Sequence, residues 1–216
     1  MFDLLQNLDY YCERVGPGLL NEPLNLFSNA AFFCAALYIQ KLAKKRRVYL
    51  LRVRILVGVC YSIGVGSALF HSFANVLTVL ADIIPIALFV VTAVWFVMED
   101  VFHFSMTKRL LLAGGFVVAA VLCSVFLKNP IFNGSEMYFT PLLMLIVMTA
   151  FSYQQKNANS REVLLATLIF ASSLLVRMVD LAFCPFWPFG THFLWHILNG
   201  ATLLFVMRFY LESDGY

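Results

Sequence analysis

The chain has 216 residues, of which 62% are hydrophobic and only 12% charged, and its formal net charge is +3. Soluble domains carry about one-quarter charged residues, so this composition excludes an ordinary water-soluble protein and indicates one surrounded by lipid. The basic residues form one cluster rather than a stripe on a folded face, which argues against nucleic-acid binding.

Seven stretches have the length and apolarity of a spanning helix, which needs roughly 20 mostly apolar residues. The connections between them are short, and no linker or repeat indicates a second domain. The sequence therefore predicts an all-α fold, a single seven-transmembrane-helix bundle over residues 1–216, with residues 1–21 outside the first helix. The predicted spans are Glu22–Gln40, Val53–His71, Leu77–Met98, Leu110–Leu127, Met137–Tyr153, Val163–Phe183 and Thr191–Leu211.

The distribution of Lys and Arg predicts the orientation of this bundle. Seven of the fifteen basic residues lie between Lys41 and Arg54, in the first connection, and five more fall on the same side of the membrane if the helices alternate. Because cytoplasmic loops carry the excess of Lys and Arg, we expect the N-terminus outside and the C-terminus in the cytoplasm. The cluster itself is interpreted as a topology determinant rather than as a site for lipid headgroups.

Ionisable residues within spans are costly and mark function by default. On the predicted topology all but one of them fall in a single layer near the outer face, and the exception, Arg177, lies one turn deeper. The members of this set are Glu22, His71, Asp82, Arg177, Asp180, His192 and His196.

Three histidines of this layer can form a metal site. His192 and His196, in "THFLWH", are four residues apart and project from one helix face, and His71 can supply a third nitrogen. Three histidines and a water make a catalytic type of zinc site, in which the pKa of the bound water falls toward about 7. Ser67 shares a helix face with His71 and can donate to an oxyanion, and Asp82 is positioned to take and return a proton.

At these residues the sequence resembles the alkaline ceramidase family, which belongs with the adiponectin-receptor-like membrane hydrolases. The resemblance rests on "EPLNLFSN", "SALFH", "ADIIP" and "THFLWH", which occur in this order on the first, second, third and seventh spans. It implies a seven-helix zinc amidase that cleaves ceramides to a fatty acid and a sphingoid base. Carried over by position, the zinc ligands are His71, His192 and His196, Ser67 supports the oxyanion, and Asp82 handles protons.

The same resemblance raises the possibility of a calcium site in the N-terminal segment, at Asp9, Glu13 and Glu22. Eukaryotic relatives bind calcium through an Asp-Trp-x-Glu-x-Asn run and a Glu at the first helix. Aligned on "YCER", this chain has Tyr11 in place of the Trp and Val15 in place of the Asn, so it lacks an oxygen ligand that a calcium ion needs. The alternative for Glu22 is an anchor at the helix N-terminus, where its charge suits the dipole.

Two further pairs are predicted from their positions. Cys12 and Cys184 both fall on the outer side, where a disulfide can form, with free thiols as the alternative. Arg177 and Asp180 are three residues apart and are expected to neutralise each other and brace the sixth helix, with binding of a substrate headgroup as the alternative role of Arg177.

The function predicted from these features is hydrolysis of an N-acyl lipid drawn from the bilayer. The alternatives are a hydrolase for another acyl lipid, a seven-helix receptor or sensor with a structural metal, and an ion transporter. A transporter is disfavoured because its site would lie at mid-membrane rather than near one face. We expect a multi-pass protein of a bacterial inner membrane, with the site near the extracytoplasmic face.

Overall fold

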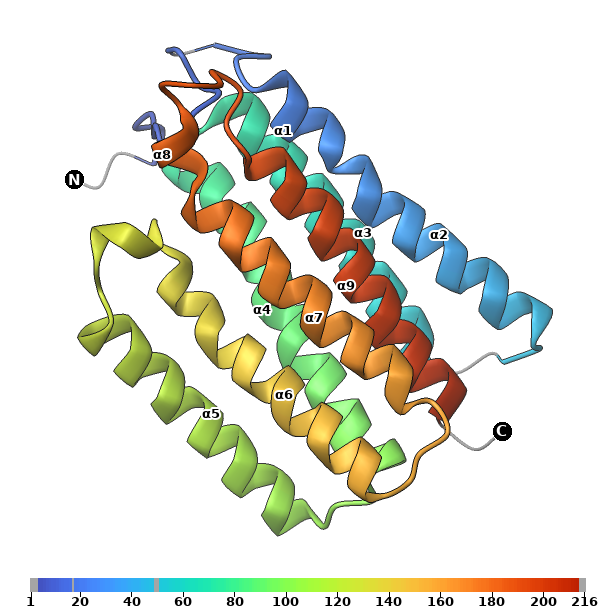
Figure 1. Cartoon of the computed structure of the whole chain (residues 1–216). Helices are drawn as coiled ribbons and strands as arrows, with labels where there is room; N and C mark the ends of the chain where they lie inside the picture. Colours follow the sequence, from blue (N-terminus) through green and yellow to red (C-terminus); the bar gives the residue numbers. More distant parts are fainter. Residues whose placement is uncertain (1–3, 17, 49–50, 214–216) are drawn as a thin grey trace.

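The protein is described from a computed structural model, which covers residues 4–16, 18–48 and 51–213 (Figure 1). Within these ranges every regular element is helical, apart from one antiparallel bridge between Asn7 and Asn75. The all-α class is therefore confirmed. The elements are α1 (Pro23–Ser28), α2 (Ala30–Lys45), α3 (Leu51–Phe73), α4 (Val76–Phe96), η1 (Val97–Val101, a π-helix), α5 (Met106–Phe126), η2 (Pro130–Phe132), η3 (Ser135–Tyr138), α6 (Phe139–Gln154), α7 (Ser160–Met178), α8 (Asp180–Phe183) and α9 (His192–Ser213).

The long helices run side by side, and α9 lies among the others while α5 lies at the edge (Figure 1). The most extensive contacts join α7 to α9 and α3 to α4, and α2 packs on both α3 and α9. In contrast, none of the hydrophobic window of α5 is buried, and this helix meets only α6 and η3 to any extent. The last helix of the chain is thus positioned to bring residues into contact with the first two spans.

Six helical segments of the described residues are long and apolar enough to cross a membrane. They are Pro23–Lys45, Leu51–Phe73, Val76–Val101, Met106–Phe126, Ser135–Gln154 and His192–Ser213. The predicted sixth span, Val163–Phe183, is divided in the structure between α7 and the short α8. Helix α7 has 19 residues and lies beside α6 and α9, but it carries Arg161, Glu162 and Arg177, which lower its hydropathy.

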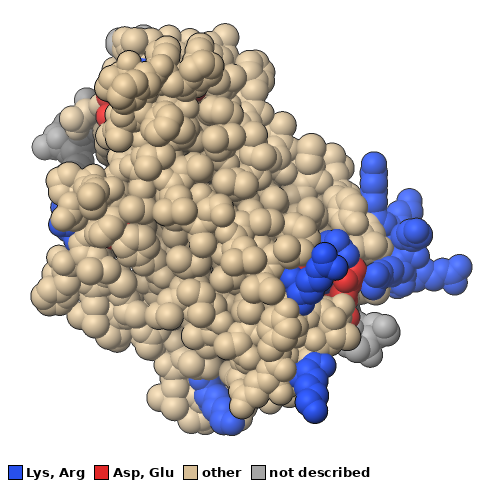
Figure 2. All heavy atoms as spheres, in the orientation of Figure 1, with Lys and Arg blue, Asp and Glu red and all other residues tan. Residues whose placement is uncertain are grey.

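The charged side chains gather at the end of the bundle where α2 and α9 finish (Figure 2). Ion pairs link the helices there: Arg52 binds both Glu99, at 3.0 Å, and Asp100, at 2.5 Å, and Arg109 binds Glu99 at 2.7 Å. Tyr210 of α9 also donates to Asp100 at 2.5 Å. This end therefore carries charged side chains that are partly exposed, whereas the polar residues at the opposite end are buried.

The N-terminal segment covers the opposite end of the bundle. The Leu8 amide donates to the Ala74 carbonyl at 2.7 Å, and the Leu77 amide donates to the Leu4 carbonyl at 3.0 Å. Just there α4 begins with a capping box, in which Asn75 and Thr78 each bind the other's backbone amide. The segment is thus hydrogen-bonded to the turn between α3 and α4, directly above the ends of those helices.

Gly66 sets how closely α3 approaches α4. A Cβ at this position would lie 1.9 Å from the Ala81 carbonyl oxygen, which belongs to the backbone and cannot swing away. The neighbours of these two residues are Ser67 and Asp82, so the close crossing also determines how near that pair can lie. Gly58, on the same helix, is exposed, and a Cβ there would meet no atom within 4 Å.

We predict that Gly66→Ala destabilises the protein, because the added methyl group must push the two helices apart. Overpacking of this kind costs about 1–3 kcal/mol. The measurement is thermal unfolding of the purified protein in detergent, with Gly58→Ala as the matched control that should leave the midpoint unchanged or raise it, since Ala is the better helix former. Equal midpoints for the two variants would contradict the close crossing.

Candidate metal centre and its chamber

Three buried histidines from two helices converge beneath the N-terminal segment. His71 lies in the last turn of α3, His192 is the first residue of α9, and His196 follows one turn later. One ligand atom from each lies within 4.8 Å of the others, and all three side chains are buried. Among the described residues this is the one group of three or more such side chains that can hold a metal ion.

Glu22 fixes the ring of His71. Its Oε2 lies 2.5 Å from His71 Nδ1. Burial opposes ionisation of Glu22, but hydrogen bonds from His71, Asn25 and Arg14 outweigh it and lower the pKa of its carboxyl. A carboxylate only accepts, so Nδ1 carries a proton, and in the neutral ring the Nε2 of His71 has a free lone pair. This carboxylate–histidine pair is the arrangement that commonly orients a metal ligand.

Ser28 fixes the ring of His196 by binding its Nδ1. The Ser28 hydroxyl donates to the Asn25 carbonyl at 2.9 Å, so its oxygen accepts from His196 Nδ1 at 2.7 Å. The Nε2 of His196 is then also left with a lone pair, and it faces the Nε2 of His71 at 3.1 Å. Two lone pairs that face each other repel, so the two nitrogens share either a proton, in an N–H···N hydrogen bond, or a metal cation.

The third ring, His192, supports the same interpretation. Its ring stacks on Tyr11 with centroids 3.7 Å apart, and its Nδ1 is buried without a hydrogen-bond partner. A buried polar atom without a partner is costly and requires an explanation. The donor set, with two facing lone pairs and one unsatisfied nitrogen, fits a bound metal ion.

The N-terminal carboxylates are engaged in other contacts. Glu13 accepts from the amides of Leu24 and Asn25, at 2.7 and 2.9 Å, and so binds the first turn of α1. Burial raises the pKa of the Glu13 carboxyl, although these two amides oppose the shift. Asp9 is exposed.

Arg14 brings a positive charge to Glu22. Its Nε donates to Glu22 Oε1, and its terminal nitrogens donate to the carbonyls of Gly16, at 3.2 Å, and His71, at 3.1 Å. The guanidinium thus neutralises the carboxylate and ties the N-terminal segment to α3. The hypothesis of a calcium site at Asp9, Glu13 and Glu22 gains no support from these contacts, whereas the alternative of a structural role for Glu22 does.

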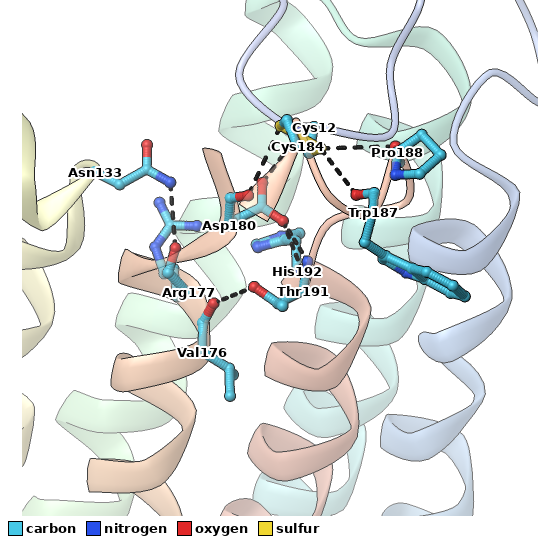
Figure 3. Close-up of a disulfide and its surroundings, with 10 residues drawn as sticks. All are labelled: Cys12, Asn133, Val176, Arg177, Asp180, Cys184, Trp187, Pro188, Thr191 and His192. Carbon is cyan, nitrogen blue, oxygen red and sulfur yellow. Dashed lines mark hydrogen bonds between the residues drawn. A yellow bond between two sulfur atoms is a disulfide. The ribbon is translucent and has the colours of Figure 1, made fainter. Parts of the chain in front are cut away.

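Asp180 does not pair with Arg177, so that expectation was wrong. The Oδ1 of Asp180 accepts from the amides of Thr191, at 2.7 Å, and His192, at 2.9 Å, and its Oδ2 accepts from the Cys12 amide at 3.1 Å (Figure 3). The carboxylate is satisfied by the free amides at the start of α9, where a negative charge also suits the helix dipole. It therefore fixes the backbone of His192, the first candidate metal ligand of that helix.

Gly190 makes room for this contact. Its φ is +61°, which favours glycine, and a Cβ there would lie 2.2 Å from Asp180 Oδ1 and 2.5 Å from Cys12 Cβ. Cys12 and Cys184 are joined as a disulfide, with Cα atoms 5.5 Å apart (Figure 3). The N-terminal segment and the connection between α8 and α9 thus meet directly above the histidines.

A largely apolar chamber begins at the histidines and runs down the bundle. About 950 Å³ of space, part of it open to the surroundings of the protein, lies between its lining residues, which include Ser67, Asp82, His192 and His196. Its lining residues on α4 extend from Asp82 to Val94, a rise of about 18 Å. The Oδ1 of Asp82 is buried without a hydrogen-bond partner. The chamber has the shape for a long apolar chain whose polar part lies at the metal centre.

The contacts that hold the rings were not predicted from the sequence. Ser28, Tyr11 and Arg14 were given no role at the metal centre, and Asp180 was assigned the wrong partner. "EPLNLFSN" contained a signal for Ser28, since it lies two turns after Glu22, but nothing in the sequence indicates which histidine each residue meets. Arg177, expected in an ion pair, instead lines the chamber.

Comparison with known proteins identifies one family. A model of the family described as Ceramidase matches residues 11–213, which is nearly the whole chain. No curated protein matches the chain.

We predict that Cys12 and Cys184 are oxidised in the native protein, because their backbones are already in bonding range. Alkylation of the denatured, unreduced protein followed by mass spectrometry should modify three cysteines, Cys34, Cys60 and Cys123. Cys12→Ser should release Cys184 and raise the number of modified residues by one. Modification of Cys12 and Cys184 in the unreduced wild-type protein would contradict the disulfide.

Proposed function

Since the chain belongs to the ceramidase family, whose members hydrolyse the amide bond of ceramide, we propose that it is a zinc-dependent intramembrane hydrolase. It cleaves N-acyl sphingolipids to a fatty acid and a sphingoid base. The observation that carries the proposal is the convergence of His71, His192 and His196 beside a chamber that Ser67 and Asp82 line. Membership of a hydrolase family argues against the alternative of a non-enzymatic receptor.

Zinc is the metal that suits this centre. Three histidines with an open fourth position are typical of catalytic zinc, whereas structural zinc sites have four protein ligands. No carboxylate or thiol of the described residues joins the three histidines in the metal-ligand group. When bound, zinc supplies Lewis acidity for the amide carbonyl and lowers the pKa of an attacking water.

The side chains of this protein position the metal ligands, transfer protons and bind the carbonyl oxygen of the substrate. Glu22 and Ser28 hold the rings of His71 and His196 in the ligating tautomer. Asp82 accepts a proton from the attacking water and delivers it to the leaving amine, and Ser67 donates a hydrogen bond to the carbonyl oxygen as charge develops there. The apolar wall of the chamber excludes bulk water and holds the hydrocarbon chains.

The bundle is proposed to cross the membrane seven times as a single domain, 1–216, with α7 as the sixth span. Helix α7 has 19 residues, and its charges lie in its first turn, at Arg161 and Glu162, and in its last turn, at Arg177. Its apolar middle is therefore free of ionisable groups. With the basic end in the cytoplasm, the N-terminus, residues 1–21 and the metal centre lie near the extracytoplasmic face of a bacterial inner membrane.

The metal and proton-transfer roles are tested by a pair of variants. His71→Ala should fail to retain zinc and lose hydrolysis, while Asp82→Asn should retain roughly one zinc per chain and lose about 10²–10⁴-fold in kcat. Zinc is measured by elemental analysis and activity by release of fatty acid from a fluorescent N-acyl lipid. The control is His103→Asn, an exposed histidine outside the cluster. Full hydrolysis after complete removal of zinc would refute the proposal.

The orientation is tested by single cysteines at exposed positions on the two ends. A membrane-impermeant maleimide applied to intact cells should label Leu19→Cys, in the N-terminal segment, but not Gln155→Cys, between α6 and α7. Lysed cells should label both, and the wild-type protein measures background from its native cysteines. The reverse pattern would overturn the proposed orientation.

A further inference from the structure

Arg177 is a buried cation in the chamber wall without an acidic partner. It lies in the last turn of α7, is only 9% exposed, and lines the chamber together with Tyr11, Tyr138 and Trp195. None of the ion pairs among the described residues involves it. An arginine remains protonated under all ordinary conditions, so a full positive charge is buried here.

The contacts of the guanidinium satisfy it only in part. Its carbon lies 5.6 Å from the ring centroid of Tyr11 and 5.4 Å from those of Tyr138 and Trp195. Such cation–π contacts contribute about 0.5–2 kcal/mol each, less than the several kcal/mol that burial of a charge costs. One terminal nitrogen donates to the Tyr11 hydroxyl at 3.1 Å, but Nε is buried without a partner.

The groups that face Arg177 form no direct ion pair with it, although the Asp82 carboxyl interacts with its charge at longer range. Burial raises the pKa of the Tyr11 phenol, so this hydroxyl is neutral and is not a counter-ion. Asp180 is bound to the start of α9. Asp82 is the one carboxylate among the residues that line the chamber, and it forms no ion pair with the guanidinium. An arginine with free donors in this position is suited to bind an oxyanion through two parallel hydrogen bonds.

The position of Arg177 places such an anion close to the reacting atoms. The ring of Tyr11 stacks on His192 with centroids 3.7 Å apart, and the guanidinium carbon lies 5.6 Å from the centroid of the same ring. Trp195 contacts both groups as well, since its ring lies 6.5 Å from that of His192. Because Tyr11 and Trp195 each contact both Arg177 and His192, a group bound by Arg177 lies close to the candidate metal centre, while the apolar wall contacts the hydrocarbon chains.

We propose that Arg177 binds a carboxylate of the lipid in the chamber and makes an N-acyl amino acid lipid a better substrate than a neutral one. This proposal rests on the proposed amide hydrolysis and extends its substrates from N-acyl sphingolipids to N-acyl amino acids. The amine half of such a lipid carries the carboxylate beside the amide that is cleaved. The fatty acid released by hydrolysis has the same chemistry, so it is the second source of a carboxylate that Arg177 can bind.

The test compares two substrates that differ only in charge, N-palmitoyl-serine and N-palmitoyl-serinol. The full-length zinc-loaded protein should hydrolyse the serine lipid with a kcat/KM at least tenfold higher. Arg177→Gln should lower kcat/KM for that lipid by about 10–100-fold, mainly through KM, since a hydrogen bond to a charged group contributes about 1.5–3 kcal/mol. The value for the serinol lipid should stay within about threefold.

Two further variants separate recognition from structural support. Arg177→Lys keeps the charge without the paired donors and should retain part of the preference for the serine lipid. Arg208→Gln removes an arginine that is paired with Glu162 and Glu212 at the other end of the bundle, and it should leave both substrates unaffected. Equal losses on both substrates in Arg177→Gln and Arg177→Lys, together with lower thermal stability, would assign Arg177 a purely structural role and overturn the proposal.

Binding of palmitate and of hexadecanol, measured by calorimetry, requires no turnover and identifies the source of the carboxylate. Weaker palmitate binding in Arg177→Gln without a preference for the serine lipid would support carboxylate binding but assign it to the product. If the wild-type protein and Arg177→Gln bind palmitate and hexadecanol equally well, and the serine lipid is not preferred, the proposal that Arg177 binds a carboxylate is overturned. If the wild-type protein hydrolyses ceramide but neither serine-derived lipid, the proposed substrate preference fails. If it hydrolyses none of the three, the proposed function fails as well, and palmitate binding still decides whether Arg177 binds a carboxylate.

Discussion

The site depends on two imidazole nitrogens that are held with their lone pairs facing each other. Glu22 and Ser28 determine this by accepting the Nδ1 protons of His71 and His196, which leaves the Nε2 atoms 3.1 Å apart. In a buried environment that arrangement is unfavourable on its own and becomes favourable when a cation binds. Three contacts hold α1, α3 and α9 in the positions that this arrangement needs. They are the Arg14–Glu22 ion pair, the Asp180 carboxylate at the start of α9 and the Cys12–Cys184 disulfide.

Each of these contacts involves a residue of the N-terminal segment. Arg14 links Glu22 to the carbonyl of His71, and Tyr11 stacks on His192. The Cys12 amide donates to Asp180, which in turn holds the first turn of α9. A segment of little regular structure therefore aligns two helices that are distant in sequence. Glu13 and Glu22 take part in this alignment, because Glu13 binds the first turn of α1 and Glu22 binds Arg14 and His71.

The sequence predicted the helices and the candidate metal ligands because both leave local signals. Apolar runs of about 20 residues identify spans, and the i, i+4 spacing of His192 and His196 places them on one face. The sequence did not predict the partners of Asp180 and Arg177, because those partners depend on how α7, α8 and the N-terminal segment pack together. Spacing of three residues suggested an ion pair, but the free amides at the start of α9 bind the carboxylate instead.

The three histidines of the candidate metal centre are made at widely separated stages of translation. His71 precedes His196 by 125 residues, and the long helices α4, α5, α6 and α7 lie between α3 and α9 in the chain. During synthesis, His71 can bind Glu22, which precedes it, but it cannot meet His192 and His196 until α9 has been made. A chain that stalls before α9 lacks two of the three histidines and therefore cannot form the group.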